Sequence, residues 1–307
     1  MHLGQNVGMA DTRPQARDFG GSGPWVGLSD TQRAIVLALL RHGRLSRPEI
    51  MKLVGISPGS ITRLTTPLVD NGILMARTER TACTGRPQSP LEVRADAESI
   101  IGVNLSGESL IAVLADLHLN VLATARRTLP GHAPADVVAS LTDAAIELTR
   151  SRPDAPAPSC ASVSLGAAAT DERTVTDAVF LGWHRVPLAE LVKTRLRMPT
   201  AVGNDLAAMT LQEAWFGAGR EHDRLVLITV GAGIGFGLVV GGEVITTPDA
   251  ELGLVGGIPV ADDGRPATSL PAMDCLTSPA IERAWSGQGR PPLPAARVVD
   301  LAKRGEA

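Results

Sequence analysis

The chain has 307 residues, of which 44% are apolar, which is enough for two or three compact units with real cores. Its longest apolar run, Leu225 to Val240, is too short for a membrane span and is interrupted by four glycines, and no signal-peptide pattern opens the chain, so the sequence predicts no membrane segment. The cysteines, Cys83, Cys160 and Cys275, form no close pair, which excludes a disulfide framework or zinc site readable from spacing and favours a reducing, cytoplasmic environment.

Charge is divided unevenly along the chain. The net charge is −3, but the segment from Arg41 to Arg94 has nine Lys or Arg and four Asp or Glu, so it carries +5 and the remainder −8. A basic segment on an acidic body is typical of a nucleic-acid-binding head on a regulatory domain. An ordinary solvated basic surface is the alternative, which charge alone does not exclude.

The N-terminal part predicts a tail followed by helices. Residues 1 to 24 are rich in Gly, Pro, Asp and Arg, and we expect them to be disordered. A domain of residues 25 to 94 follows, whose first helix starts at Ser29 or Asp30 and ends before Gly43. The capping box SRPE, residues 46 to 49, then starts a short second helix.

A third helix is predicted to begin at Ser57 and Pro58. Its apolar residues repeat at helical spacing and leave polar side chains for another surface, which we predict to bind DNA: Ser57, Ser60, Thr62 and Arg63. Pro67 removes the N–H that would bond the Arg63 carbonyl, so we expect the helix to kink or end near Thr66.

The segment GILMARTERTACTGRPQSPLEV predicts the hairpin wing of a winged helix, because two short extended runs flank a centre rich in Thr, Gly and Arg. Arg86 lies between Gly85 and Pro87 in a narrow, extended backbone and is predicted to enter a DNA minor groove. A linker turn is the alternative. With the helices before it, this wing predicts a double-stranded DNA operator as the partner.

From Ser99 onward the sequence predicts an α/β domain in which strands and helices alternate. The expected elements are the strands SIIGVNL, SLIAVLAD, VLATARRTL, CASVSLGAAA and residues 197–202, and the helices ADVVASLTDAAIELTRS and residues 205–216.

A strand, glycine turn and second strand are predicted for residues 224 to 248. The alternate glycines lie between two apolar runs and leave room for backbone N–H groups to approach a phosphate: Gly231, Gly233, Gly235 and Gly237. The dinucleotide fingerprint is excluded, because it needs a glycine at Phe236 and a helix afterwards. A hairpin whose glycines only relieve crowding is the alternative.

Several segments, from about Leu28 to the C-terminus, resemble the ROK family of bacterial sugar kinases and repressors. They are, in the order of the family, GRP (85–87), IGVNLSGESLIAVLADLHLNVL (101–122), LGWHRVPLAELVKTRLRMPTAVGNDLAA (181–208), the glycine turn and ELGLVGGIPV (251–260). The resemblance implies an actin-like, ribonuclease-H-type domain over residues 95–307, with a first lobe of about 95–222 and a partial second lobe of 223–307. It also implies that the two glycine-containing loops derive from an ATP site.

The chain departs from the family's kinase pattern in both phosphate loops. The first loop, D-x-G-G-T in the family, has Asn104, Ser106, Gly107 and Glu108 here, and the central threonine of the second loop is Ala232. A carboxylate that orients magnesium is lost and a negative charge is added, which disfavours ATP. We therefore expect no catalytic residue and no cofactor, and regard four glycines as a vestigial phosphate loop: Gly107, Gly231, Gly233 and Gly235.

The sugar side of the family's site is partly kept. Asn204 and Asp205 match the pair that meets the sugar, and they are candidate contacts for a sugar or sugar-derivative effector. Asp205 as a helix N-cap is the alternative. Other polar contacts of the family are replaced, at Phe180, Leu254 and Gly257. Of the zinc motif only Cys275 remains, so no metal is predicted and Cys275 is expected to be a small buried hydrophobe.

The sequence therefore predicts a DNA-binding transcriptional regulator, a repressor, whose inactive sugar-kinase-like domain serves dimerisation or effector sensing. The partners expected are an operator, a sugar-like effector and a second copy in a homodimer. The alternatives are an ATP-dependent, glucokinase-like sugar kinase and a non-functional truncated fragment. The second arises because family members continue beyond the segment DLAKRGEA at which this sequence stops.

Overall fold

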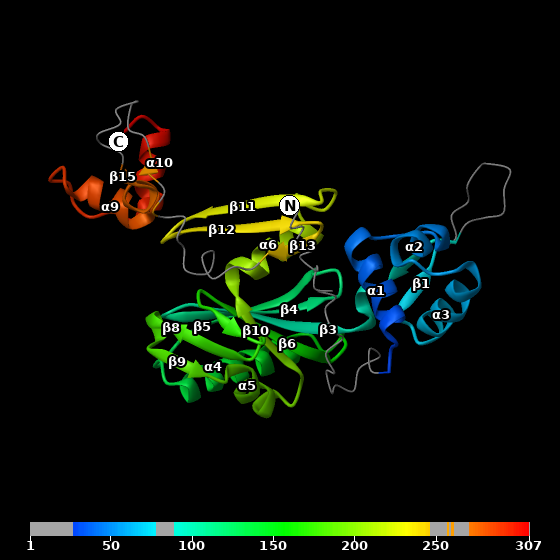
Figure 1. Cartoon of the computed structure of the whole chain (residues 1–307). Coiled ribbons are helices and arrows are strands. Elements are labelled where there is room, and N and C mark those ends of the chain that lie inside the picture. The colour runs from blue at the N-terminus through cyan, green and yellow to red at the C-terminus, as the bar shows by residue number, and fades with distance from the viewer. Residues whose placement is uncertain (1–26, 78–88, 246–256, 258, 261–269, 307) are drawn as a thin grey trace, which may run out of the picture.

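The computed structural model of the chain describes residues 27–77, 89–245, 257, 259–260 and 270–306. These residues form a helical head, a central α/β lobe, a three-stranded sheet above that lobe and a C-terminal helical group (Figure 1). The tail predicted for residues 1–24 lies outside the described residues.

Three helices and a two-stranded hairpin make up the head. They are α1 (Asp30–His42), α2 (Arg47–Val54), α3 (Pro58–Asp70), β1 (Leu74–Ala76) and β2 (Leu91–Val93). The predicted caps are confirmed: Ser29 accepts a hydrogen bond from the Gln32 N–H at 3.3 Å, and Ser46 with Glu49 forms the capping box of α2. The glycine that follows each of these two helices has a positive φ.

The head has an apolar core of its own, to which every helix and both strands contribute. Its buried members are Ile35, Val36, Leu39, Leu45, Ile50, Ile61, Leu68, Ile73, Leu74, Leu91 and Val93. A separate buried cluster fills the central lobe. The head can therefore hold its shape through contacts among its own residues.

The central lobe is built on a five-stranded sheet of order β10-β6-β3-β4-β5. Its strands are β3 (Ser99–Leu105), β4 (Ser109–Asp116), β5 (Val121–Thr128), β6 (Pro158–Leu165) and β10 (Thr200–Asn204). Helices α4 (Pro134–Ser151) and α5 (Leu188–Leu196) cover one face, and α6 (Asp205–Trp215) lies on the other (Figure 1). Because β3, β6 and β10 are parallel, their carboxyl ends meet at one edge.

Several elements of this lobe differ from the sequence expectation. The small sheet of β7 (Ala169–Thr170), β8 (Thr174–Ala178) and β9 (Trp183–Val186) and helix α5 were not predicted. The strand expected over residues 197–202 starts only at Thr200, because Arg197 ends α5 in the left-handed conformation, at φ 56°. Short 3-10 turns occupy Ala95–Ala97 and Val179–Leu181.

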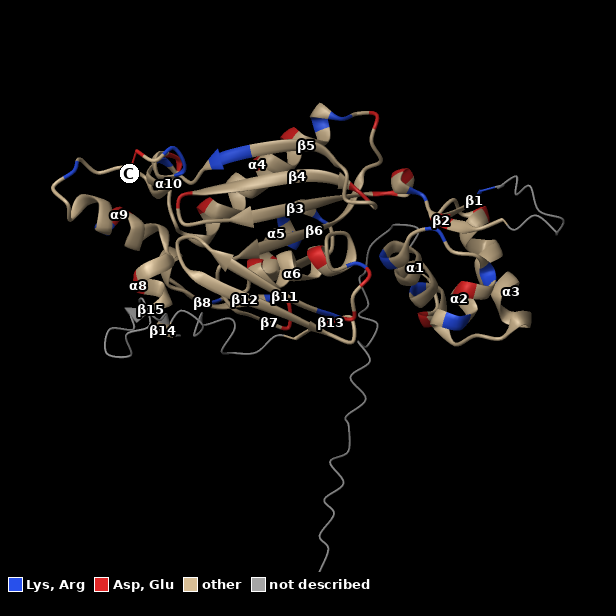
Figure 2. Ribbon diagram, turned by 90° about the horizontal axis from the view of Figure 1, so that it is seen from above, with Lys and Arg blue, Asp and Glu red and all other residues tan. Residues whose placement is uncertain are grey.

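A second, antiparallel sheet of β11 (Arg224–Val230), β12 (Ile234–Val240) and β13 (Glu243–Ile245) packs against α6 on the side away from the central sheet. This confirms the predicted strand, glycine turn and strand. Viewed from above, the sheet lies over α6 (Figure 2). The described C-terminal elements are β14 (Pro259–Val260), β15 (Leu270–Pro271), α8 (Ala272–Leu276), α9 (Ser278–Ser286) and α10 (Ala295–Lys303).

Candidate functional site

Helix α3 presents the polar surface that the sequence predicts. Ile61, Thr65 and Leu68 are buried in the head, whereas Thr62 and Arg63 are exposed. Ser57 has the extended conformation of an N-cap residue, but its hydroxyl lies 3.0 Å from the Ser60 hydroxyl and does not bond the helix N–H groups. The hydroxyls and guanidinium therefore occupy the outward side of the first two turns.

Of the two outcomes expected from Pro67, a kink or an end near Thr66, the end is wrong, because the helix continues to Asp70. Two interactions keep the turn after Pro67 helical. Leu68 is fully buried, which fixes this turn against the core, and the Pro67 carbonyl accepts the Asn71 N–H at 3.0 Å. The single lost backbone hydrogen bond of the proline falls on the exposed side, where water can satisfy the carbonyl.

The wing is present as an antiparallel pair, β1 with β2, in which Met75 pairs with Glu92. Glu92 accepts hydrogen bonds from Arg77 Nε at 2.6 Å and Arg44 Nε at 3.2 Å. Partial burial acts to raise the pKa of Glu92, but these two arginines outweigh it and hold the pKa below its usual value. The carboxylate therefore ties the base of the wing to the helical part of the head.

Lys and Arg occur on all three helices of the head (Figure 2). Several of the arginines serve intramolecular contacts: Arg47 Nη1, for example, donates to the Ser89 carbonyl at 3.3 Å. Arg63 makes no such contact in the described part of the head. Arg86 lies outside the described residues, so its minor-groove role stays a prediction.

The candidate ligand residues lie where parallel strands end. Asn204 is the last residue of β10 and the N-cap of α6, and its Oδ1 accepts the Ala207 N–H at 3.0 Å. Asp205 is therefore not the cap, contrary to the alternative considered from the sequence. Its Oδ1 accepts the Leu206 N–H at 2.8 Å, and the carboxylate is only half-buried.

Polar groups of neighbouring strands line the same edge. Asn104 Nδ2 donates to Ser164 Oγ at 3.2 Å, and both residues precede the ends of their strands. A Cβ added at Gly166 would lie 3.7 Å from Asp205 Oδ2, which places that turn beside the carboxylate. Ligands of α/β sheets bind outside the carboxyl ends of parallel strands, so this edge has the right position for a small-molecule site.

The first phosphate loop is a tight turn between β3 and β4. Ser106 Oγ donates to the Ser109 carbonyl at 2.9 Å, and Phe180 is the neighbour nearest to Gly107, 3.6 Å from where a Cβ would lie. The Glu108 side chain is exposed. The sequence of this turn is Ser-Gly-Glu, so it contains no threonine or lysine that could donate to a phosphate.

The glycines of the second loop divide into two kinds. A Cβ at Gly231 or Gly233 would meet no atom within 4 Å, so these two leave open space at the β11–β12 turn. Gly235 lies within β12 and not in the turn, and a Cβ there would lie 2.7 Å from Leu206 Cδ2 of α6. Gly235 and Gly237 thus leave room for α6 to pack on β12. For these two glycines the structure agrees with the alternative given above, that the glycines of the hairpin relieve crowding.

Cysteine and metal chemistry add little to either site. Cys275 is half-buried in α8, so the expectation of a buried residue is wrong, and Cys160 is also half-buried. Burial raises the pKa of the Cys160 thiol. Across the part of the chain that the structure describes, no three His, Cys, Asp or Glu residues are grouped to hold a metal ion, and no helix is long and apolar enough to cross a membrane.

Comparison with known proteins identifies both parts of the chain. Residues 28–75 match the winged helix-turn-helix DNA-binding family, and residues 100–306 match the ROK family. The chain is 26% identical over 264 residues to the xylose repressor of Caldicellulosiruptor bescii, covering 84% of this chain and 65% of that protein. It is 32% identical over 189 residues to the glucokinase of Thermotoga maritima, covering 59% of this chain and 56% of the enzyme.

Solved structures show the same architecture. A ROK family transcriptional regulator described as a homologue of the E. coli MLC protein superposes with a TM-score of 0.68 at 23% identity, over 85% of this chain and 69% of that one. The chain spans about two thirds or less of the length of these relatives. Since the family match covers most of the sequence and the fold agrees, the chain belongs to the ROK family, with a winged helix-turn-helix followed by an actin-like, sugar-kinase-type domain.

Proposed function

We propose that this protein is a DNA-binding transcriptional repressor whose ROK domain senses a sugar or sugar derivative without phosphorylating it. The observation that carries the proposal is the outward face of α3, where Thr62 and Arg63 are exposed and their side chains make no hydrogen bond or ion pair within the described head, while Ile61 and Leu68 are buried in its core. Such a helix can enter a major groove with its first turns foremost. The xylose repressors among the relatives support this reading.

The test is titration of labelled operator variants at one fixed salt concentration, since affinity depends on salt. Arg63→Ala should weaken specific binding by about 1–3 kcal/mol and relax the sequence preference at one position. Arg126→Ala is the matched control, because Arg126 is an exposed arginine on β5 of the central lobe. Unchanged affinity in Arg63→Ala, with the head still folded by circular dichroism, would overturn the proposal.

Arg86 should act differently from Arg63. Within the proposal it inserts into a narrow A·T-rich minor groove, where the negative potential is strongest. Arg86→Ala should therefore weaken binding mainly for operators with such a tract, with no change in the base preference set by α3. Equal losses on all operators would assign Arg86 to ordinary phosphate contact.

A sugar kinase is the second candidate function, and the similarity to a glucokinase favours it. The residues of the phosphate loops argue against it. Asn104 stands where the family's carboxylate would orient magnesium, Glu108 adds negative charge to the turn, and Ala232 supplies no hydroxyl. Asp205 survives as a base, but a base alone cannot replace the nucleotide contacts.

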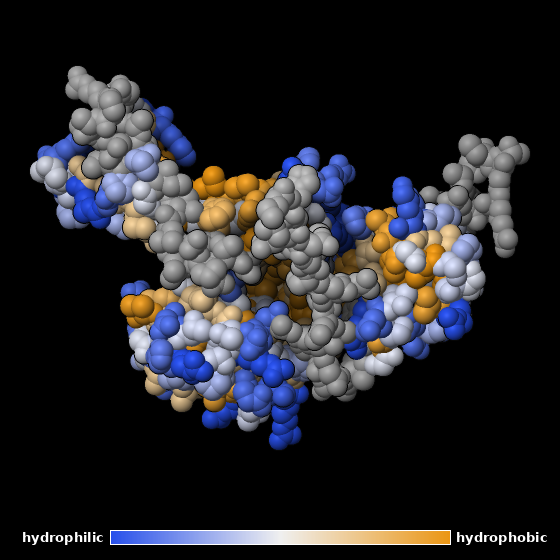
Figure 3. All heavy atoms as spheres, in the orientation of Figure 1, coloured by the Kyte–Doolittle hydropathy of each residue, from blue (hydrophilic) through white to orange (hydrophobic). Residues whose placement is uncertain are grey.

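We also propose a homodimer that uses the outer face of the β11–β12–β13 sheet. Val226, Ile228 and Val230 are 55–64% exposed, and apolar residues gather at this place on the upper edge of the molecule (Figure 3). Register places Arg224, Val240 and Glu243 in one row across the same face. A two-fold axis parallel to β12 would set Arg224 against Glu243 of the partner subunit, which is complementary in charge.

The oligomeric state tests this surface. Light scattering should give a dimer, Arg224→Glu should weaken it, and the double change Arg224→Glu with Glu243→Arg should restore it. A monomeric parent protein, or a dimer that persists in Ile228→Lys, would show that this face is not the interface.

Domain boundaries and location follow from the same proposal. We infer a tail of residues 1–24, a head of 25–94 and a ROK domain of 95–307 whose lobes divide near residue 222. A repressor acts where DNA is, so we place the protein in the cytoplasm. Limited proteolysis should cut first between residues 94 and 98, where the head meets the ROK domain, if the two are separate units.

A further inference from the structure

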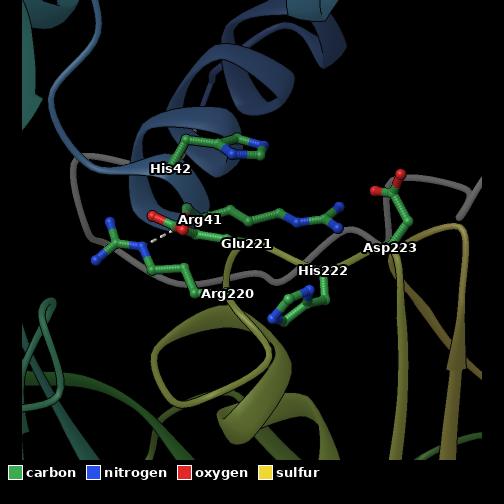
Figure 4. A pocket seen from close by; sticks show the side chains of 6 residues that line it. All are labelled: Arg41, His42, Arg220, Glu221, His222 and Asp223. Atoms are coloured by element: carbon green, nitrogen blue, oxygen red, sulfur yellow. Dashed lines mark hydrogen bonds between the residues drawn. The ribbon is translucent and has the colours of Figure 1, made fainter.

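A pocket of about 270 Å³ lies between the end of α1 and the loop that joins α6 to β11. It is lined by Arg41, His42, Arg220, Glu221, His222 and Asp223 (Figure 4). The first two residues belong to the head and the other four to the ROK domain. This junction pocket is separate from the candidate ligand residues at the start of α6.

At the junction pocket, Arg41 of the head reaches the ROK domain and Arg220 of the ROK domain reaches the head. Arg220 Nε donates to the Arg41 carbonyl at 3.1 Å, drawn as a dashed line in Figure 4. A Cβ at Gly43 would lie 2.6 Å from Arg220 Nη2, and a Cβ at Gly242 would lie 2.6 Å from Arg41 Cζ. Each guanidinium therefore lies directly against a glycine of the opposite part of the protein.

The cationic groups of the junction pocket have no carboxylate partner among the described residues. Arg41 Nε is buried without a hydrogen-bond partner, and neither Arg41 nor Arg220 takes part in an ion pair within 4.0 Å among the described residues. Glu221 and Asp223 line the pocket but form no such pair with them. Burial and then the charges of Arg41 and Arg220 lower the pKa of His42, which indicates a positive potential there.

We propose that the junction pocket binds a small oxyanion, the phosphate group of a free metabolite or inorganic phosphate, and that the bound anion fastens the head to the ROK domain. Arg41 and Arg220 supply charge-assisted hydrogen bonds, for which planar guanidinium groups and phosphate oxygens have matching geometry. His42 and His222 are further donors. The volume accommodates a phosphate with a small substituent.

A phosphate of the DNA backbone is the other source of the same chemistry. The position of the pocket favours a free anion, because the pocket lies where α1 meets the ROK domain, whereas α3 lies on the far side of the head (Figure 1). None of the six residues that line the junction pocket belongs to the phosphate loops or to the candidate sugar contacts.

Binding of inorganic phosphate to the full chain is the direct test, measured by ³¹P line broadening and by the thermal midpoint at constant ionic strength set with chloride. Saturable binding should appear in the parent protein and weaken tenfold or more in both Arg41→Gln and Arg220→Gln. Arg297→Gln, an exposed arginine of α10, is the control and should bind as the parent does. Absence of saturable binding, or equal binding in all variants, would overturn the proposal.

DNA binding separates the two sources. If the pocket holds a free anion, the slope of log affinity against log salt should be the same in Arg220→Gln and in the parent. A slope reduced by about one, together with no saturable binding of free phosphate, would assign the arginines to the DNA backbone and refute the free-anion site.

Discussion

Gly237 gives the sharpest test of how the glycine-rich hairpin is used. A Cβ at this position would collide with Thr210 Oγ1 and lie 2.8 Å from Thr210 Cβ and Cγ2. Thr210 is fully buried, and its hydroxyl donates to the Leu206 carbonyl at 2.7 Å, so it cannot turn away without losing that bond. Overpacking costs about 1–3 kcal/mol and the lost hydrogen bond about 1 kcal/mol more. Gly237→Ala should therefore lower the free energy of unfolding by about 2–4 kcal/mol.

Urea denaturation followed by circular dichroism and tryptophan fluorescence measures this difference. Gly233→Ala is the matched control, because its Cβ would meet no atom within 4 Å and its φ lies outside the left-handed region. The control should stay within about 0.5 kcal/mol of the parent. Adding Thr210→Ala to Gly237→Ala should recover part of the loss. If Gly237→Ala unfolds at the same urea concentration as Gly233→Ala, close packing of α6 on β12 is not why Gly237 is glycine.

Three further outcomes are expected. Coupled-enzyme assays with ATP and glucose, mannose or N-acetylated hexoses should show no turnover, and turnover that disappears in Asp205→Asn would contradict the proposed loss of kinase activity. Calorimetry with a sugar panel should detect binding that Asp205→Ala weakens and Asp143→Ala, a change on the exposed side of α4, does not; equal binding by both would leave Asp205 as a helix-start residue. Because the pKa of Glu92 is lowered in the folded head, its stabilisation is complete above the unfolded value of about 4.3 and is lost as pH falls through the folded-state value. In Glu92→Gln the free energy of unfolding should therefore fall less steeply as the pH is lowered below about 4.3. An unchanged pH dependence would show that Glu92 does not contribute to it.

Local signals predicted the head well because its helix ends are set by residues close together in sequence. The sequence predicted a cap at Ser29 or Asp30 and a capping box at Ser46, and the structure has Ser29 as the cap of α1 and the capping box at Ser46, each formed by contacts three residues apart. Pro67 shows the limit of the same reasoning. The local penalty predicted a kink or an end near Thr66, but the helix does not end there, because burial of Leu68, a tertiary contact, holds the last turn of α3 in place.

The candidate site was predicted less completely, since its neighbours come from distant segments. Asn204 and Asp205 were recognisable from the family resemblance. Which of them caps α6 depends on where the helix begins, and the structure makes Asn204 the cap and Asp205 the first helical residue. The junction pocket had no signal that sequence alone could supply. Arg41 and Arg220 are 179 residues apart, and the two glycines that admit them look like ordinary turn residues.

Helix α6 lies between the candidate ligand residues, Asn204 and Asp205, and the junction pocket. It begins at the ligand edge with Asn204 as its cap, packs through Leu206 and Thr210 on the glycines of β12, and leads directly into the loop that carries Arg220. Its 11 residues span about 16 Å. A ligand at the start of α6 and an anion held by Arg41 and Arg220 would therefore lie toward the two ends of one short helix.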